Sequence, residues 1–555
     1  MSKGHMIILG GAFDRHDAAD VIQLAHDDLE NITWPSVKRA HGAHRIATYL
    51  REEGYDIEVL DFWPAWTPIQ ILKFFNQRVR EDTICVGLSA MFPLSYGIMG
   101  KDSKAQKKVI EMFQTIKRLK ELHPQLPFVG GSHHITAMID YDLDFYITGY
   151  GEYAIAELLK YFKKEFNTLQ IQKEMFQGIS INLINCSESY PAYPMPNAGV
   201  VYEDRDYIQP QEVLSLELSR GCKFRCKFCS HPVLGVRGDY SRCGDSLKEE
   251  LITNYDRWGV KTYSVTDETI NDTPEKLSKC ANVIKNLPFD VNLSGFVRAD
   301  LLVAKPDTWQ DIWDMGLRSH YYGLETLNHK AGAYVGKGMD PDRLKKGLLE
   351  MQKWFLDKGQ YRCQTSLIIG LPGETKESFF EGLQWVKDNL TVGAYSVSPL
   401  YIAGGTVTNM MSANQSVFEK TWRDEGIFTE MTNEEMGVDY SELHEDTRHF
   451  ALPLNTNAYL KWSHDTMNIW EAFKIFDEVV NDKELKEDIG PGVFYYHRYL
   501  TTNKYTIEDI YDKTYATDDA KDYLEPLDNK DLAEQEKFIK DYIEKKLSTT
   551  EIINV

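Results

Sequence analysis

The feature that most constrains the fold is a run of strand patterns that alternate with helix patterns. Six segments have the length and β-branched, apolar character of strands, and five segments with helical periodicity separate them. Parallel strands joined by helices close naturally into a barrel, whose chemistry lies at the strand carboxyl ends. The run therefore predicts a partial (β/α)6 barrel of the TIM type. The expected strands are 213–219, 261–266, 291–297, 318–324, 365–370 and 394–398, and the expected helices are 246–258, 274–285, 308–315, 341–356 and 376–389.

The same alternation occupies the amino-terminal part of the chain and predicts a separate α/β unit, a Rossmann-like doubly wound parallel sheet. Its expected strands are 6–9, 56–62, 83–89, 127–130 and 144–148, and its expected helices are 37–53, 69–80, 105–122 and 152–162. A proline-containing stretch at 191–196 is typical of a linker, and the alternation fades from about residue 401. We expect a first domain over 1–190, the barrel over 200–405 and a mostly helical carboxyl-terminal region over 406–555.

Charge and hydropathy narrow the class of protein. The 555 residues carry a formal net charge of −22, which makes nucleic acid an unlikely partner. A membrane span is not expected, since no stretch of about 18 apolar residues occurs. The first residues lack the pattern of a signal peptide, so we expect a cytoplasmic protein.

Three of the eight cysteines form a tight group directly after the first barrel strand. Cys222, Cys226 and Cys229 have the spacing C-x3-C-x2-C, and three thiolates on one short loop can hold three irons of a [4Fe–4S] cluster. One iron then stays open to a substrate group. A zinc site is the alternative, with His231 or Cys243 as a fourth ligand. The five scattered cysteines are interpreted as small buried hydrophobic residues.

This cysteine loop, with an aromatic residue before its last cysteine and a strand before its first, resembles the radical S-adenosylmethionine (SAM) superfamily. The resemblance covers about residues 213–399 and implies that the open iron chelates SAM and that cleavage of SAM gives a 5′-deoxyadenosyl radical. It also implies SAM-binding positions at later strand ends. These expected positions are Asp267, Glu268, Arg298, Glu325 and Gly370, and Phe228 within the cysteine loop is a further expected SAM contact.

Four glycine-containing loops of the first domain follow its predicted strands, where a doubly wound sheet binds its ligand. Together with the cysteine loop, they resemble the cobalamin-binding domain of the cobalamin-dependent radical SAM enzymes. The resemblance implies cobalamin contacts at Ser89, Gly130, Gly131, Gly149, Gly151 and Glu152. A Rossmann-like domain without a cofactor is the alternative. His16 lacks the glycine context of a cobalt-binding motif, and we interpret it as a loop histidine.

The resemblance implies an enzyme with three cofactors, namely a [4Fe–4S] cluster, SAM and cobalamin. Methylation of an unactivated carbon of a small molecule is the expected reaction, with an electron donor such as flavodoxin or ferredoxin as partner. A non-methylating radical SAM enzyme, such as a cyclase or an oxidase, is the first alternative. A methylthiotransferase would need three more cluster cysteines in the first domain, where only Cys85 and Cys186 occur. A non-catalytic iron–sulfur or zinc protein is an alternative of another class.

The carboxyl-terminal region gives two weaker expectations. Residues 457–464 and 467–472 carry aromatic side chains that either line the substrate side or, as is more common for apolar helix faces, belong to a core. Residues 533–547 form a charged amphipathic pattern, which we interpret as a helix capping the protein on its solvated surface.

Overall fold

The computed structural model describes residues 2–13, 37–89, 104–131, 141–176, 178–186, 199–210, 212–224, 226–229, 240–359, 361–390, 393–402, 426–445, 447–455, 460–482 and 537–548. The proline-containing linker, His16, His231 and residues 457–459 lie outside these ranges.

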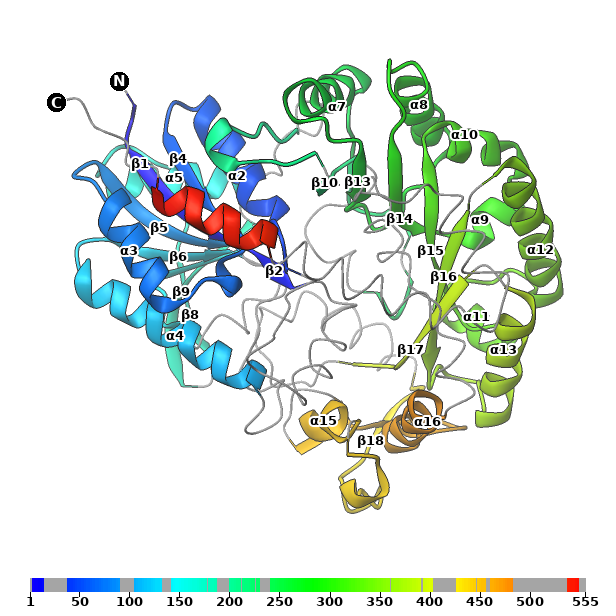
Figure 1. Ribbon diagram of the computed structural model, residues 1–555. Coiled ribbons are helices and arrows are strands. Elements are labelled where there is room, and N and C mark those ends of the chain that lie inside the picture. Colours follow the sequence, from blue (N-terminus) through cyan, green and yellow to red (C-terminus); the bar gives the residue numbers. More distant parts are fainter. Residues whose placement is uncertain are drawn as a thin grey trace.

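The expected partial barrel is confirmed as a sheet of six parallel strands in the order β10-β13-β14-β15-β16-β17. Figure 1 shows these strands as a curved wall with helices on its outer side. The strands are β10 (Val213–Leu216), β13 (Thr262–Val265), β14 (Asn292–Val297), β15 (Leu317–Glu325), β16 (Arg362–Ile369) and β17 (Gly393–Pro399).

The first predicted strand, 213–219, is divided in the structure. After β10 the chain leaves the barrel, and β11 (Ser219–Arg220) pairs antiparallel with β12 (Tyr240–Ser241). The division has a side-chain cause, because Asp267 Oδ1 accepts a hydrogen bond from the Leu218 amide at 2.8 Å in place of a strand partner. The cysteine loop therefore begins at the end of a small hairpin at the mouth of the barrel.

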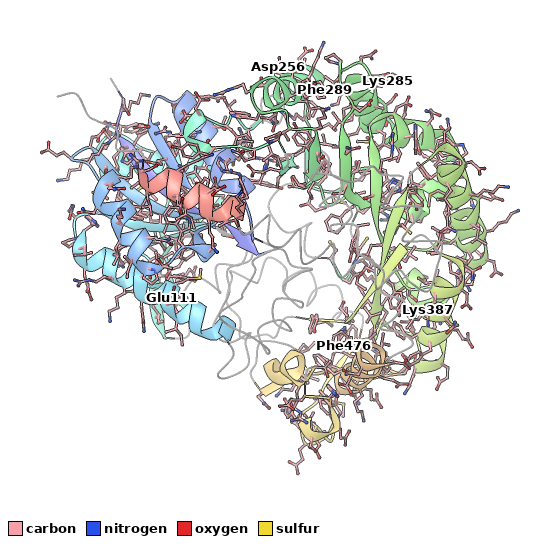
Figure 2. The ribbon with its side chains drawn as sticks, in the orientation of Figure 1. Glu111, Asp256, Lys285, Phe289, Lys387 and Phe476 are labelled. Atoms are coloured by element: carbon pink, nitrogen blue, oxygen red, sulfur yellow. The ribbon has the colours of Figure 1, made fainter. Side chains whose placement is uncertain are left out.

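The outer layer contains the predicted helices and two short ones that the sequence pattern missed. Helices α9 and α11 have only 6 and 7 residues. Figure 2 shows Asp256 and Lys285 on the outer rim of this layer, pointing away from the sheet. The helices are α7 (Gly244–Trp258), α8 (Pro274–Ile284), α9 (Ala299–Ala304), α10 (Trp309–Asp314), α11 (His329–Val335), α12 (Pro341–Lys358) and α13 (Lys376–Asn389).

The two faces of the barrel sheet differ in polarity. Side chains alternate along a strand, so residues paired across parallel strands share a face. Tyr263 and Leu293 belong to the core beneath the helices, whereas their neighbours Ser264 and Ser294 are paired across strands on the opposite, concave face. A closed TIM barrel fills its interior with branched apolar residues. The hydroxyl-bearing concave face instead suits a barrel whose interior receives a polar ligand.

The first domain is a seven-stranded sheet in the order β4-β1-β5-β6-β7-β9-β8, parallel except for the edge strand β8. The strands are β1 (His5–Gly10), β4 (Asp56–Leu60), β5 (Thr83–Ser89), β6 (Phe128–Gly131), β7 (Phe145–Thr148), β8 (Gln172–Phe176) and β9 (Ile179–Asn185), and short strands β2 (Ala12–Phe13) and β3 (Val37–Lys38) pair separately. The doubly wound class is confirmed, and the hairpin β8–β9 is an addition. No strand was predicted between the helix at 152–162 and the linker.

Both faces of this sheet are buried. Along β1, Ile7 and Leu9 pack into one apolar cluster, whereas Met6 and Ile8 pack into another on the opposite face. Helices α2 (His41–Glu52) and α5 (Glu152–Phe162) cover the second cluster, and helices α3 (Pro68–Arg78) and α4 (Lys104–Leu122) cover the first. Burial on both faces explains the nearly continuous apolar strands of the sequence.

The expected solvated cap at 533–547 is wrong. The helix observed at 537–548 packs against the first domain, on the same face as α3 and α4 (Figure 1). Ile539, Tyr542 and Ile543 are buried in its core, and Lys546 is 1% exposed. The charged residues suggested an exposed helix, but the buried Lys546 is compensated by Glu58 of the first domain, whose carboxylate lies 3.3 Å from its Nζ atom.

The described part of the carboxyl-terminal region beyond the barrel contains α15 (Arg448–Ala451), α16 (Ile469–Asn481) and the small hairpin β18 (Thr429–Glu430) with β19 (Trp462–Ser463). Trp462 and Trp470 are buried in the barrel core cluster. Their aromatic pattern is therefore core packing. None of the helices within the described residues is long and apolar enough to cross a membrane.

Candidate active site at the barrel mouth

The three cysteines lie on one loop directly after β11. Gly221 has φ +88°, a left-handed turn that redirects the chain into the loop. The Lys227 amide donates to the Val335 carbonyl at 3.3 Å, and the Cys229 amide donates to the Cys226 carbonyl at 3.0 Å. Cys222, Cys226 and Cys229 are all partly buried. The loop is thus tied to α11 and presents three thiols at the strand carboxyl ends.

The spacing of the sulfur atoms separates the two metal hypotheses. Three thiolates on one tetrahedral zinc would lie about 3.8 Å apart, given Zn–S bonds of about 2.3 Å. Within the described residues, the one group of three ligand atoms converging within 4.8 Å is His44, Asp61 and Asp206, so the cysteine sulfurs are spread more widely. Cys243 accepts a hydrogen bond from the Ser246 amide at 3.4 Å as the N-cap of α7. The three described sulfur atoms are therefore not preassembled for one zinc ion, and Cys243 is engaged as a helix cap.

Of the two predicted carboxylates after β13, Asp267 supports the loop from beneath. It is 1% exposed, accepts hydrogen bonds from the Leu218 amide and the Ser219 hydroxyl, and lies 3.4 Å from Lys276 Nζ. Burial raises the pKa of Asp267 to about 6, despite the opposing effect of Lys276. Glu268 is only partly buried and adds to the charge around Tyr150 of the first domain. Glu268 is therefore the carboxylate of this pair that remains at the mouth.

Arg298, one of the expected SAM-binding positions, lies against the cysteine loop. Its Nη1 is 3.6 Å from the Cys226 sulfur, and its guanidinium lies 4.0 Å from the centre of the Phe224 ring. Asp300 holds the other side of the guanidinium at 2.5 and 3.0 Å. An arginine here places positive charge beside thiolate sulfur, which stabilises the anionic form of the ligands.

Glu325 ends β15 in a left-handed conformation, with φ +65°, where the register to β16 shifts. Such a conformation costs free energy in a residue other than glycine and is typical of functional positions. Its carboxylate lies 3.1 Å from Lys337 Nζ, which also bonds the Gly323 carbonyl. Lys337 is 5.7 Å from the centre of the Phe228 ring, so these three residues meet beside the loop.

The sequence analysis missed Lys337, although the glycines at 336 and 338 on either side mark an unusual turn. A small cavity beside it is lined by Asp300, Gly323, Thr326 and Asn328 among others. The end of β15 therefore combines a carboxylate, an ammonium group and an aromatic ring within reach of the cysteine loop.

Gly370 has a different environment from the other predicted positions. Its φ is +90°, and a Cβ atom there would overlap the Trp462 ring. Its carbonyl accepts a hydrogen bond from His464 Nε2 at 3.0 Å. The glycine thus permits the carboxyl-terminal segment to dock on the end of β16, a role that strand patterns alone did not reveal.

The predicted cobalamin positions lie along one edge of the first sheet. Gly10 of β1 is paired with Ser89 of β5, and Ser89 with Gly131 of β6. Among the described residues, no atom lies within 4 Å of a Cβ atom added to Gly131. Gly130, Gly149 and Gly151 lie at the same edge, at the ends of β6 and β7. The edge offers close approach to backbone, which a large ligand requires.

Glu152, the last of these positions, is directed at the second domain. Its carboxylate bonds the guanidinium of Arg220, and its side chain is 3% exposed. Tyr150 lies over the same guanidinium, 4.4 Å from it. Burial alone would raise the pKa of Glu217, the other partner of Arg220, but Arg220 and His41 hold it well below its usual range.

A partial parallel barrel with three cysteines on the loop after its first strand defines the radical SAM class of proteins. Residues 216–386 match the family model of the radical SAM superfamily. The chain therefore contains a radical SAM domain, and this stretch includes the cysteine loop and most of the barrel.

Curated relatives share limited sequence identity with the chain. The uncharacterized methyltransferase PH0819 of Pyrococcus horikoshii is 22% identical over 206 residues, which are 37% of this chain and 43% of that protein. The ribosomal protein uS12 methylthiotransferase RimO of Actinobacillus succinogenes is 22% identical over 390 residues, covering 66% and 74%. The chain thus spans less than half the length of the first of these relatives.

Two solved structures resemble the fold over both domains. The radical SAM methyltransferase TsrM from Kitasatospora setae, with tryptophan substrate and a SAM analogue bound, has a TM-score of 0.53 at 15% identity and covers 72% of this chain and 74% of its own. The apo form of the cobalamin-dependent radical SAM enzyme OxsB also has a TM-score of 0.53, at 13% identity, covering 94% and 74%. These likenesses establish the architecture.

Proposed function

We propose that this chain is a cobalamin-dependent radical SAM enzyme that methylates an unactivated carbon of a small molecule. The observation that carries the proposal is the cysteine loop at the barrel mouth, with Arg298 beside Cys226 and Glu325 beside Lys337. When bound, the [4Fe–4S] cluster would supply the electron that cleaves SAM, and cobalamin would supply the methyl group.

The residues around the loop suit the binding of SAM. Lys337 offers an ammonium group for a carboxylate, and Glu325 and Glu268 offer carboxylates for an amine or a ribose hydroxyl. Phe228 and Phe224 supply apolar surface next to the cysteines, with cations 5.7 and 4.0 Å from their ring centres. Charged partners on both sides of a partly buried site fix the orientation of a zwitterionic ligand.

Three observations support cobalamin in the first domain. The edge formed by Gly10, Ser89 and Gly131 has space at Gly131, where no described residue lies within 4 Å of an added Cβ atom, and Tyr150 joins that edge to the barrel. OxsB, which shares the two-domain architecture, is named as cobalamin-dependent. A small-molecule substrate fits the polar concave face, and the cluster needs a one-electron donor such as flavodoxin or ferredoxin.

A methylthiotransferase, the activity named for RimO, is the alternative that the relatives raise. Such an enzyme would hold a second cluster on three cysteines of the first domain, which has only Cys85 and Cys186. Both are buried in the apolar core on one face of the sheet, and burial raises the pKa of each thiol well above its usual range. The geometry therefore favours methyl transfer without sulfur insertion.

The cysteine assignment is tested by anaerobic reconstitution with iron and sulfide, followed by reduction with dithionite in the presence of SAM. The wild-type chain should bind about four irons per chain and release 5′-deoxyadenosine. Cys226→Ala should lose most of the iron and the product, whereas Cys243→Ser should keep both, because Cys243 only caps α7. Absence of 5′-deoxyadenosine from the wild-type chain, despite a full cluster, would overturn the enzyme assignment.

Cobalamin binding is tested separately with hydroxocobalamin and gel filtration. We expect corrin absorbance to remain with the protein, and Gly131→Trp to release it, because the bulky ring would occupy the open space at the sheet edge. Equal retention by Gly131→Trp, or no corrin on the wild-type chain, would contradict this part of the proposal.

A further inference from the structure

The two domains meet at a closed ring of charged side chains. Arg45 Nε lies 3.6 Å from Glu152 Oε1, and the same carboxylate bonds Arg220 Nη2. Arg220 Nε then binds Glu217 Oε1 at 2.7 Å, with Nη2 3.2 Å from Oε2. Glu217 Oε2 lies 3.8 Å from His41 Nε2, which returns the chain of contacts to helix α2.

His41 and Arg45 are four residues apart on α2, so they lie on one face of that helix. The guanidinium groups of Arg45 and Arg220 alternate with the carboxylates of Glu152 and Glu217, and the His41 imidazole lies beside Glu217. Helices α2 and α5 of the first domain thereby hold Arg220 and Glu217 of the second. All five residues lie in parts of the chain that the structure describes. The ring therefore fixes the cysteine-bearing hairpin against two helices at once.

Because the ring is buried, the loss of any one of its side chains is costly. The side chains of Arg45, Glu152 and Arg220 are only 2–3% exposed. Removing one member of a buried ion pair leaves an uncompensated charge, which is far more costly than losing an ion pair at the surface. The guanidinium of Arg220 is planar and binds Glu217 through two nitrogens while it also binds Glu152, which a lysine ammonium cannot reproduce.

Arg220 stands between the two candidate cofactor loops. It precedes Cys222 by two residues, and its guanidinium is covered by Tyr150, which lies between the glycines at 149 and 151. Glu152 opens α5 immediately after that glycine loop. One side chain thus contacts the sheet edge of the first domain and continues into the cysteine loop of the second.

We propose that Arg220 is a positioning residue that sets the separation of the corrin-binding edge and the cysteine loop, an inference that rests on the proposed function. Transfer of a group between sites on different domains requires the reacting atoms to be aligned within about 1 Å. Helix α5 and the hairpin β11–β12 supply that alignment through Glu152 and Arg220. Neither residue needs to touch SAM or substrate.

The test compares full-length, cluster-reconstituted wild type with Glu152→Gln and Arg220→Lys. Glu157→Gln is the matched control, because Glu157 lies on the same helix, is buried, and within the described residues its carboxylate bonds Lys160 and Thr168 of the first domain. Amide hydrogen exchange is measured over the hairpin and cysteine loop at residues 213–229. Glu152→Gln should accelerate exchange there by about tenfold or more, although the substitution lies in the other domain, and Glu157→Gln should not.

The second readout is the ratio of methylated product to 5′-deoxyadenosine. Arg220→Lys should keep iron content and 5′-deoxyadenosine formation within about twofold of wild type, while the ratio falls by about tenfold or more. A ratio unchanged in Arg220→Lys, or exchange that rises only within the first domain in Glu152→Gln, would overturn the proposal. Failure of the proposed function would look different, since the wild-type chain itself would lack corrin or product while the exchange measurement still reports on the ring.

Discussion

Two buried carboxyl groups at the barrel mouth show how the surroundings of a residue decide its role. Asp267 accepts bonds from an amide and a hydroxyl and lies beside Lys276, so its charge is compensated. Glu374, at the end of the fifth strand, is 2% exposed and receives one hydrogen bond, from the Thr326 hydroxyl. Burial raises the pKa of Glu374 to about 8, so it is largely protonated at neutral pH.

The raised pKa of Glu374 predicts a pH dependence of folding. The folded chain binds this proton more tightly than the unfolded chain, whose carboxyl has its ordinary pKa of 4.5. The stability it contributes is complete below pH 4.5 and is lost as the pH rises through about 8. Glu374→Gln should remove this dependence, which amounts to at most about 1.4 kcal/mol per pH unit. Denaturant titrations at several pH values measure it.

An exposed control on the neighbouring helix α13, Glu381→Gln, should keep the wild-type profile. If Glu374→Gln and wild type lose stability in parallel between pH 4.5 and 8, the neutral state of Glu374 is refuted.

At the scale of single elements, the end of β16 contributes both to the concave face of the barrel and to the docking of the carboxyl-terminal segment. Gln364 and Ser366 of β16 lie on the concave face, while Gly370 just beyond the strand receives Trp462 and His464 of the carboxyl-terminal segment. The Trp462 indole donates to the Leu400 carbonyl at 2.8 Å and stacks on His464 with ring centroids 5.3 Å apart. The segment thereby closes the end of the barrel next to the last strand.

Gly370→Ala should destabilise the fold by roughly 2–5 kcal/mol, because its left-handed backbone disfavours a side chain and the added methyl meets Trp462. The matched control is Gly382→Ala within α13, where the new Cβ would lie an ordinary 3.5 Å from Leu327. This control should be neutral or gain up to about 1 kcal/mol from helix propensity. Equal midpoints for the two variants in chemical denaturation would contradict the close packing at Gly370.

On the scale of the whole molecule, the two ends of the chain pack into the same domain. The Tyr542 hydroxyl accepts a hydrogen bond from the Asp61 amide at 3.0 Å, across 481 residues of sequence. Next to it, Asp61 is bound by Arg39 at 2.5 Å and by His44 at 2.9 Å, and Arg39 continues to Glu212 before the barrel. Arg39 already supplies the positive charge that compensates Asp61. We therefore interpret the cluster of His44, Asp61 and Asp206 as part of a buried ion-pair network and not as a metal site.

Tyr542→Phe should lower the free energy of unfolding by about 1–3 kcal/mol, because the buried Asp61 amide loses its acceptor. Hydrogen exchange should rise at residues 56–78, beneath the helix at 537–548, and not in the barrel. Tyr161→Phe, at an exposed tyrosine of the same domain, should leave stability within about 0.5 kcal/mol of wild type. A Tyr542→Phe variant as stable as Tyr161→Phe would show that the hydrogen bond contributes nothing.

The sequence predicted those features that depend on local pattern. The periodicity of apolar residues predicted both sheets, because an element that is buried on one face places apolar residues at regular intervals along the sequence. The spacing of Cys222, Cys226 and Cys229 predicted three thiols on one loop. Steps of four and three residues are too short for the chain to reach another element between the cysteines. Arg298 and Glu325, which the family resemblance proposed as SAM-binding positions, lie beside the cysteine loop because the carboxyl ends of parallel strands gather at one edge.

The tertiary structure decided what depends on contacts between distant residues. Glu152 and Gly370 were predicted as cofactor contacts, but one pairs with Arg220, 68 residues away, and the other receives Trp462. Lys337 joins the site through a turn that has no strand period, and the helix at 537–548 is buried because Glu58 compensates its charge. Local periodicity records which face of an element is buried, but only the assembled fold shows which partner covers it.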